Sequence, residues 1–189
     1  MHEPIDYFEH GADIGIVGRG TLIEEAFENA ARAMFAIMAD LGQVEQHESV
    51  DIEFEEADTE LALVTWLNLL LGQARSRALI FGRFHLRRDR ASPKAEDRRS
   101  GPPKEVVGDR RSGPAEEVTQ NRRPEASEEV GTFPTIGVET GGARWRGTAE
   151  GEPWRAGLER GVEVKGATLT GLAVTERDGI WEARCVVDV

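Results

Sequence analysis

The sequence contains very little cysteine and no long apolar run, and each shortage excludes a class of protein. Its 189 residues include one cysteine, Cys185, so the chain can hold neither an internal disulfide framework nor a zinc site built from cysteines. Because Cys185 lies in an alternating apolar segment, we expect it to be a small core side chain. The longest apolar stretch, residues 62–71, contains polar residues and is too short to cross a bilayer. No basic, apolar signal segment opens the chain, so we expect a soluble, cytoplasmic protein without membrane contact.

Basic residues are scarce relative to acidic ones. The chain has 23 Lys and Arg against 35 Asp and Glu, a formal net charge of −12. Phosphate contacts require clustered Lys and Arg, so a protein of this charge is not expected to bind nucleic acid by itself. An acidic surface instead suits metal cations or a basic protein partner.

The chain divides into three parts by its periodicity. Residues 1–86 and 144–189 show helical or strand periodicity, whereas residues 87–143 are of low complexity. Residues 97–102 (Asp-Arg-Arg-Ser-Gly-Pro) recur at 109–114, and a degenerate copy begins at Asn121. Such a composition cannot bury enough apolar surface to offset the entropy of ordering, so we predict a disordered insertion within one domain. It is either a duplicated linker without function or an arm that contacts RNA or a partner.

The two periodic parts predict an α+β domain. A helix is predicted from Leu22 to Leu41: Thr21 and Glu24 have the spacing of a capping box at its start, and Gly42 ends it. A second helix is capped by Asp58 or Thr59 and runs to Ala74. Strands are predicted at residues 7–10, 14–17, 50–54, 80–86, 145–150, 162–169, 172–176 and 181–187, with a hairpin turn at 178–179. This order predicts antiparallel or mixed β-sheets packed with two main α-helices.

Three glycines precede the first helix and invite comparison with a phosphate-binding loop. The spacing of Gly15, Gly18 and Gly20 is not GxGxxG, and no acidic residue follows at the position of a dinucleotide fingerprint. We therefore predict that the glycines allow a tight turn from strand to helix.

Asp13 is a candidate site residue at the junction of two predicted strands. An aspartate there directs its carboxylate toward a sheet edge, and His10 is close enough in sequence to exchange a proton with it. Asp13 can equally be a residue that forms the turn. The other histidines show no metal-ligand spacing to His10, so a zinc site built on histidines is not expected.

The last residues of the sequence form a second candidate site. The chain ends inside a predicted strand, where Asp188 precedes Val189 and its α-carboxylate. Two close carboxylates repel and raise each other's pKa unless a cation lies between them. Hard oxygen ligands of this kind suit Mg²⁺, Ca²⁺ or Mn²⁺. The alternative is an exposed end without function.

Several segments resemble the archease family. They are the opening residues 7–16, the helix residues 22–31 with Met34-Phe35 and residues 38–41, residues 66–70, the strand at 81–84, the turn at 151–154, residues 162–165 and the final Val-Asp-Val. The likeness covers both periodic parts in order. It implies an accessory protein, not itself an enzyme, that promotes guanylylation and multiple turnover of the GTP-dependent RNA-splicing ligase. That ligase joins a 3′-phosphate or 2′,3′-cyclic phosphate to a 5′-hydroxyl in tRNA splicing or RNA repair.

The resemblance also implies a metal site and an indirect relation to RNA. The family's metal ligands map onto Asp13, Asp188 and Val189, and Asp40 matches another acidic position. Two alternatives remain open: a metal-dependent phosphoester hydrolase that uses His10 as its base, and a chaperone-like binding module that acts without metal.

The chain departs from the family pattern in three places. Gly11 stands where a threonine is usual between the histidine and the alanine, and this removes a hydroxyl beside Asp13. Leu169 and Thr170 stand where a Tyr-His pair is common. The insertion is also much longer than the family's usual connection, although a surface loop of that length has a small effect on stability.

Overall fold

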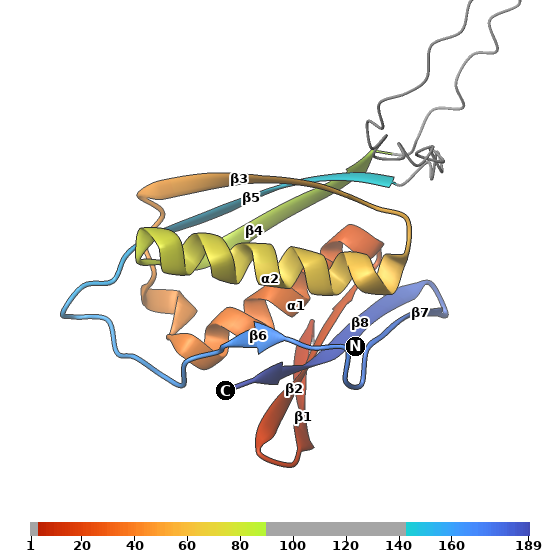
Figure 1. Ribbon diagram of the computed structural model, residues 1–189, viewed down its shortest axis with the longest axis horizontal. Helices are drawn as coiled ribbons and strands as arrows, with labels where there is room; N and C mark the ends of the chain where they lie inside the picture. Colours follow the sequence, from red (N-terminus) through yellow and green to blue (C-terminus); the bar gives the residue numbers. More distant parts are fainter. Residues whose placement is uncertain (1–3, 90–142) are drawn as a thin grey trace, which may run out of the picture. The chain divides into compact units, whose positions relative to one another are not determined.

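The computed structural model describes residues 4–89 and 143–189, which form two antiparallel sheets and two helices (Figure 1). This is the α+β arrangement that the periodicity predicts. The disordered insertion predicted at residues 87–143 lies outside the described residues except at its two ends. Those ends belong to strands, because the periodic segments extend further than their sequence patterns indicate.

The larger sheet has five strands in the order β1-β2-β8-β6, with β7 also paired to β8. Its strands are β1 (Ile5–His10), β2 (Asp13–Gly20), β6 (Gly166–Ala167), β7 (Ala173–Arg177) and β8 (Ile180–Asp188). The smaller sheet has the order β3-β5-β4, and its strands are β3 (Glu48–Glu56), β4 (Leu79–Asp89) and β5 (Ala143–Pro153). Both sheets therefore join strands from the two periodic parts of the chain.

The two helices lie between the sheets (Figure 1). They are α1 (Ile23–Met38) and α2 (Thr59–Arg77), and a short 3₁₀ helix, η1 (Leu41–Gln43), follows α1. Contact with both sheets explains why α1 has few exposed positions: its alanines at 26, 30, 31 and 33 are fully buried. In the described part of the chain, neither helix is long and apolar enough to cross a membrane.

Two of the glycines before α1 allow close packing rather than a turn: Gly18 packs against α1, and Gly15 lies under the Phe8 ring. Gly15 and Gly18 lie inside β2, so the predicted turn is wrong for both. A Cβ at Gly18 would come within 2.1 Å of the backbone nitrogen of Ala30 and 2.2 Å of the backbone oxygen of Ala26. The missing side chain therefore allows α1 to lie directly against β2.

The caps of the two helices differ from each other. The predicted capping box is wrong: α1 has Leu22 as its N-cap, without a side-chain hydrogen bond, and Thr21 instead donates to the Glu25 carboxylate from its backbone nitrogen and its hydroxyl. For α2 the Asp58 alternative is confirmed, since its carboxylate accepts hydrogen bonds from two amides of the first turn. Asp58 thus satisfies two of the donors that a helix start leaves unpaired.

The C-terminal part is less regular than its alternating pattern predicts. Only Gly166–Ala167 of the predicted strand at 162–169 is a strand. Upstream, the amides of Gly161 and Val162 donate to the carbonyls of Met38 and Ile37 at 2.8 and 3.0 Å, and so satisfy the end of α1. The predicted hairpin at residues 178–179 is confirmed, with φ of 54° and 76°. Cys185 is a buried core side chain, and burial raises the pKa of its thiol to about 12.

Candidate functional site

The five-stranded sheet brings three of the predicted site residues into one row. His10 of β1 is paired with Asp13 of β2. On the other side of β2, Ile14 is paired with Val187 of β8. The same antiparallel register, continued by one residue, sets Asp13 opposite Asp188. Residues that are paired, as His10 and Asp13 are, have Cβ atoms about 4.5–5.5 Å apart. We call His10, Asp13 and Asp188 the carboxylate row.

The row faces away from the helices. Ile16 of β2 and Cys185 of β8 are fully buried in the core beside α1. Successive side chains of a strand point to opposite faces. Asp13 and Asp188 are each three residues from these core positions and therefore point to the other face. Asp13 is half-buried, whereas His10 and Asp188 are exposed.

A tight turn fixes the position of Asp13. The pairing of His10 with Asp13 leaves Gly11 and Ala12 as a two-residue loop. Gly11 has φ of 63°, and glycine at the first of two central positions matches a type II′ hairpin turn. A threonine in this conformation would be strained, which gives the departure from the family pattern a physical reason. Asp13 is the first residue of a strand, and the turn itself is made by its two predecessors.

A lysine that the sequence analysis did not single out completes this end of the sheet. The backbone nitrogen of Lys165 donates to the carbonyl oxygen of Asp188 at 2.7 Å. Its Nζ donates to the backbone oxygen of Val189 at 2.8 Å and lies 3.9 Å from Asp188 Oδ1. The only signal in the sequence is that Lys165 closes one of the segments that resemble the archease family.

Helix α2 holds the segment that carries this lysine. Arg75 Nη2 donates to the carbonyl oxygens of Val164 and Lys165 at 2.7 and 2.6 Å. The Asn68 amide both donates to and accepts from the backbone of Ala167, at 3.0 Å each. These two bonds replace those of a neighbouring strand, so Asn68 and Arg75 position the segment beside β8.

Asp40 lies outside the row and caps η1. Its carboxylate accepts hydrogen bonds from the Gly42 amide at 3.0 Å and from Gln43 Nε2 at 2.9 Å. These bonds, that of Gln43 first, lower the pKa of the Asp40 carboxyl below its ordinary value. The geometry therefore gives Asp40 a local structural role.

The chemistry of the row fits a hard divalent cation. Among the residues that the structure describes, no three His, Cys, Asp or Glu side chains converge as a metal cluster. The row offers the carboxylates of Asp13 and Asp188, and Val189, which follows Asp188 in the chain, adds a backbone oxygen; all of these are oxygen donors. The ammonium of Lys165 lies at two of these groups as a stand-in cation, 2.8 Å from the Val189 oxygen and 3.9 Å from Asp188 Oδ1. Three protein donors would leave half or more of the shell of Mg²⁺ or Ca²⁺ to water or to a partner.

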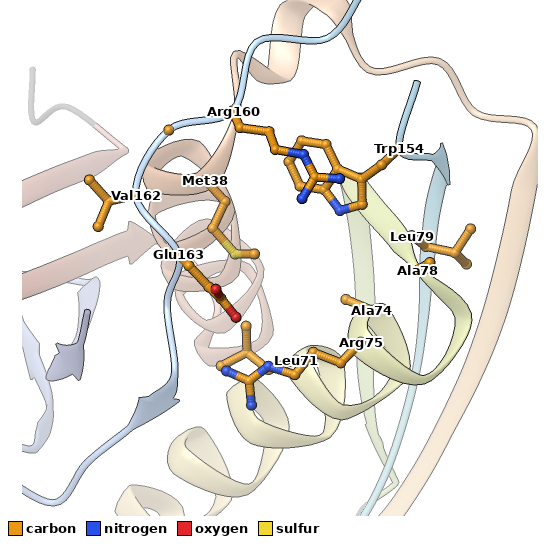
Figure 2. Close-up of a pocket in the computed structure, with 11 residues that line it drawn as sticks. Met38, Leu71, Ala74, Arg75, Ala78, Leu79, Trp154, Arg160, Val162 and Glu163 are labelled. Carbon is orange, nitrogen blue, oxygen red and sulfur yellow. The ribbon is translucent and has the colours of Figure 1, made fainter. Parts of the chain in front are cut away.

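The structure also has a cavity of about 280 Å³ that is lined in part by residues 160–163, which come shortly before Lys165 in the chain (Figure 2). Its lining is apolar at Met38 and Leu71, and the Arg160 guanidinium lies 4.3 Å from the centroid of the Trp154 ring. Arg75 borders it and so contacts both the cavity and the Lys165 segment. No residue of the carboxylate row lines this cavity.

Comparisons with known proteins agree with one another. The model of the Archease protein family matches residues 6–104 and 123–189. Protein archease of Sulfolobus acidocaldarius is 43% identical over 79 residues, 42% of this chain and 57% of that protein, so the match spans little more than half its length. Protein archease of Methanothermobacter thermautotrophicus is 26% identical over 184 residues, 97% of each chain. The solution structure of Methanobacterium thermoautotrophicum protein 1598 aligns with a TM-score of 0.65 at 26% identity, covering 98% of this chain and 99% of that one.

Proposed function

This chain belongs to the archease family, and we propose that it is an accessory protein of the GTP-dependent RNA ligase that joins 3′-phosphate or 2′,3′-cyclic phosphate ends to 5′-hydroxyls. In this proposal the chain has no turnover of its own. It promotes guanylylation of the ligase and repeated turnovers in tRNA splicing or RNA repair, and it contacts RNA only through the ligase.

The placement of Asp13 opposite Asp188 carries the proposal. Like charges directly opposite in an antiparallel pair destabilise the sheet. A cation between the two carboxylates removes the repulsion. A divalent ion held by Asp13, Asp188 and the backbone oxygen of Val189 is therefore the simplest reason for this arrangement in a member of the family.

The open shell of such an ion suits delivery to a partner. Bound there, a divalent ion supplies positive charge for the phosphoryl groups that change during nucleotide transfer. The chain holds its ligands at the exposed end of the sheet, and the ligase can complete the shell. The net charge of −12 favours a basic partner surface over direct RNA binding.

A reconstituted guanylylation assay tests this proposal. The ligase, GTP and a divalent ion are combined with the wild-type chain, with Asp13→Asn, with Asp188→Asn, or with Asp51→Asn. The last variant removes an exposed carboxylate of β3, away from the row. We expect stimulation by the wild type and by Asp51→Asn, and loss of stimulation in the two row variants. Normal stimulation by both row variants would show that the metal account is wrong.

One observation favours a second candidate, a metal-dependent phosphoester hydrolase. His10 is paired with Asp13, where a base for a metal-bound water would have to be. Hydrolysis of a phosphoester panel by the isolated chain, lost in His10→Ala, would support it. Calorimetry without any divalent-ion binding would instead support a metal-free, chaperone-like binding module.

A further inference from the structure

The backbone of Lys165 is fixed from two sides. Its nitrogen donates to Asp188 at 2.7 Å, and its carbonyl oxygen accepts from Arg75 Nη2 at 2.6 Å. Two residues later, Ala167 is joined to Asn68 by two hydrogen bonds. The base of the lysine side chain therefore has one position relative to β8, set by hydrogen bonds from α2.

The tip of the same side chain is free to move. The Lys165 side chain is 62% exposed and that of Asp188 is 52% exposed, so their ion pair at 3.9 Å is weak. The stem has four rotatable bonds and ends in a compact, strongly hydrated charge. Rotation about this stem can withdraw the ammonium from the Val189 oxygen into solvent without any change in the backbone.

We propose that Lys165 is a tethered cation that occupies the carboxylate row in the absence of metal and has to withdraw when a divalent ion binds. This inference rests on the proposed function, since it requires the row to bind such an ion. The Val189 oxygen is the shared group, because the Nζ donates to it at 2.8 Å. An ammonium and a divalent ion on the same oxygens repel each other, so their occupancies are mutually exclusive.

As a consequence, Lys165 lowers the affinity of the site for a divalent ion. The ammonium offsets part of the negative charge at Asp188 and Val189 in the ion-free chain, and the divalent ion has to displace it. Such a site gives up its ion readily to a partner that supplies further ligands. Lys165 is accordingly a residue that tunes affinity, and Asn68 and Arg75 are positioning residues that act through it.

Calorimetric titration of the full chain with Mn²⁺ tests the competition. Lys165→Gln removes the ammonium, Lys165→Arg keeps a cation, and Arg77→Gln removes an exposed charge from the last turn of α2 as a control for net charge. We expect Lys165→Gln to bind Mn²⁺ about two- to fivefold more tightly than the wild type, since the exposed pair that it removes is weak. Lys165→Arg and Arg77→Gln should stay close to the wild type, and high salt should abolish the gain.

The outcomes distinguish a failure of the Lys165 competition from a failure of the proposed metal-dependent function. If the wild type binds Mn²⁺ and Lys165→Gln binds it equally or less tightly, the competition is wrong and the proposed function stands. If no variant binds a divalent ion, both are wrong. Thermal unfolding supplies a second readout: Lys165→Gln should lower the melting temperature in chelator but not at saturating Mn²⁺. An equal decrease in both conditions would indicate a merely structural lysine and overturn the proposal.

Discussion

The three-stranded sheet and one end of the five-stranded sheet arrange charged side chains in opposite ways. On the outer face of the three-stranded sheet, Arg83 of β4 is directly opposite Glu150 of β5 and pairs with it at 3.5 Å. Arg144 of β5 reaches Glu53 of β3 at 2.8 Å. At the end of the five-stranded sheet, the register continued one residue beyond the pair of Ile14 and Val187 sets Asp13 opposite Asp188, and both are acidic.

One like-charged pair on the smaller sheet sharpens the contrast. Arg146 is opposite Arg87, but it is also opposite Glu53 on its other side and forms an ion pair with Asp89. Arg146 therefore has acids beside it, and Arg87 donates from Nε to His85 Nε2 at 3.2 Å. Beside the carboxylate row, among the residues that the structure describes, the Nζ of the exposed Lys165 lies 3.9 Å from Asp188 Oδ1. Opposite charges stabilise a sheet by roughly 0.2–1 kcal/mol a pair, and like charges destabilise it.

The difference indicates that the carboxylate row lowers the stability of the fold and is retained for function. Proteins follow the local rules of folding except at functional sites, where a violation is compensated elsewhere. The smaller sheet follows those rules, and the row violates them at a position where two distant segments meet. The following variants test whether the row is such a site.

The largest effect is expected from removing one carboxylate of the row. Asp13→Asn or Asp188→Asn should weaken divalent-ion binding by at least about tenfold, because each removes a charged ligand. Asp51→Asn on the smaller sheet should leave the affinity unchanged. Calorimetric titration with Mn²⁺ measures all three, and equal affinities would remove the distinction between the sheets.

The next effect concerns the contact from α2. Arg75→Ala should lower the free energy of unfolding by about 1–2 kcal/mol, because two carbonyl oxygens lose a charged donor. Arg77→Ala, two residues further along the same helix, should change the free energy of unfolding by less than about 0.5 kcal/mol. Urea denaturation at neutral pH compares the two, and equal values would contradict the positioning role of Arg75.

A pH-limited effect is expected at Glu152 of β5, the paired acid of the smaller sheet. Its buried carboxylate accepts from Arg155 Nε at 2.8 Å and from the Glu45 amide at 3.0 Å, and the Arg155 hydrogen bond is the main cause that lowers its pKa. A lowered pKa stabilises the fold above the ordinary value of 4.5, and this contribution is lost as the pH falls through the lowered value. Urea midpoints of the wild type and Glu152→Gln should therefore differ at pH 7 and converge in acid. A constant difference would contradict the assignment.

The smallest effects should have opposite signs on the two sheets. In chelator, Asp13→Asn should raise the free energy of unfolding by up to about 1 kcal/mol, because it removes a repulsion. Arg83→Ala should lower it by a similar or smaller amount, because it removes an exposed attraction. Saturating Mn²⁺ should reverse the sign for Asp13→Asn alone. Two changes of the same sign in chelator would show that the row is not under electrostatic strain.

Periodicity predicts much of this fold because helices and strands bury one face. It predicts both helices, most of the strands and the hairpin at residues 178–179. It fails at Gly18 because the sequence alone does not distinguish a glycine that forms a turn from one that lets a helix pack closely against a strand. It fails at residues 162–165 because the partners of that segment are the end of α1 and a side chain of α2, both distant in sequence.

The candidate site was predictable only in part for the same reason. Asp13 and Asp188 are visible as carboxylates at strand ends, and the archease resemblance connects them. Their common register depends on the pairing of β2 with β8, which no local pattern contains. The position of Lys165 depends on hydrogen bonds with Asp188, Arg75 and Val189, all distant in sequence, so no local pattern predicts it. Asp40 matches an acidic position of the archease family, but in the structure its side chain caps η1.

The most direct test of the central claim is to locate the ion. In ¹H–¹⁵N spectra of the full chain, substoichiometric Mn²⁺ broadens the amide signals nearest to its site. The account predicts that the signals of residues 10–14 and 187–189 broaden first, while those of the acidic strand β3 remain sharp. Broadening that begins at Asp51, Glu53 and Glu55 would contradict it, because the ion would then follow acidity alone and not the carboxylate row.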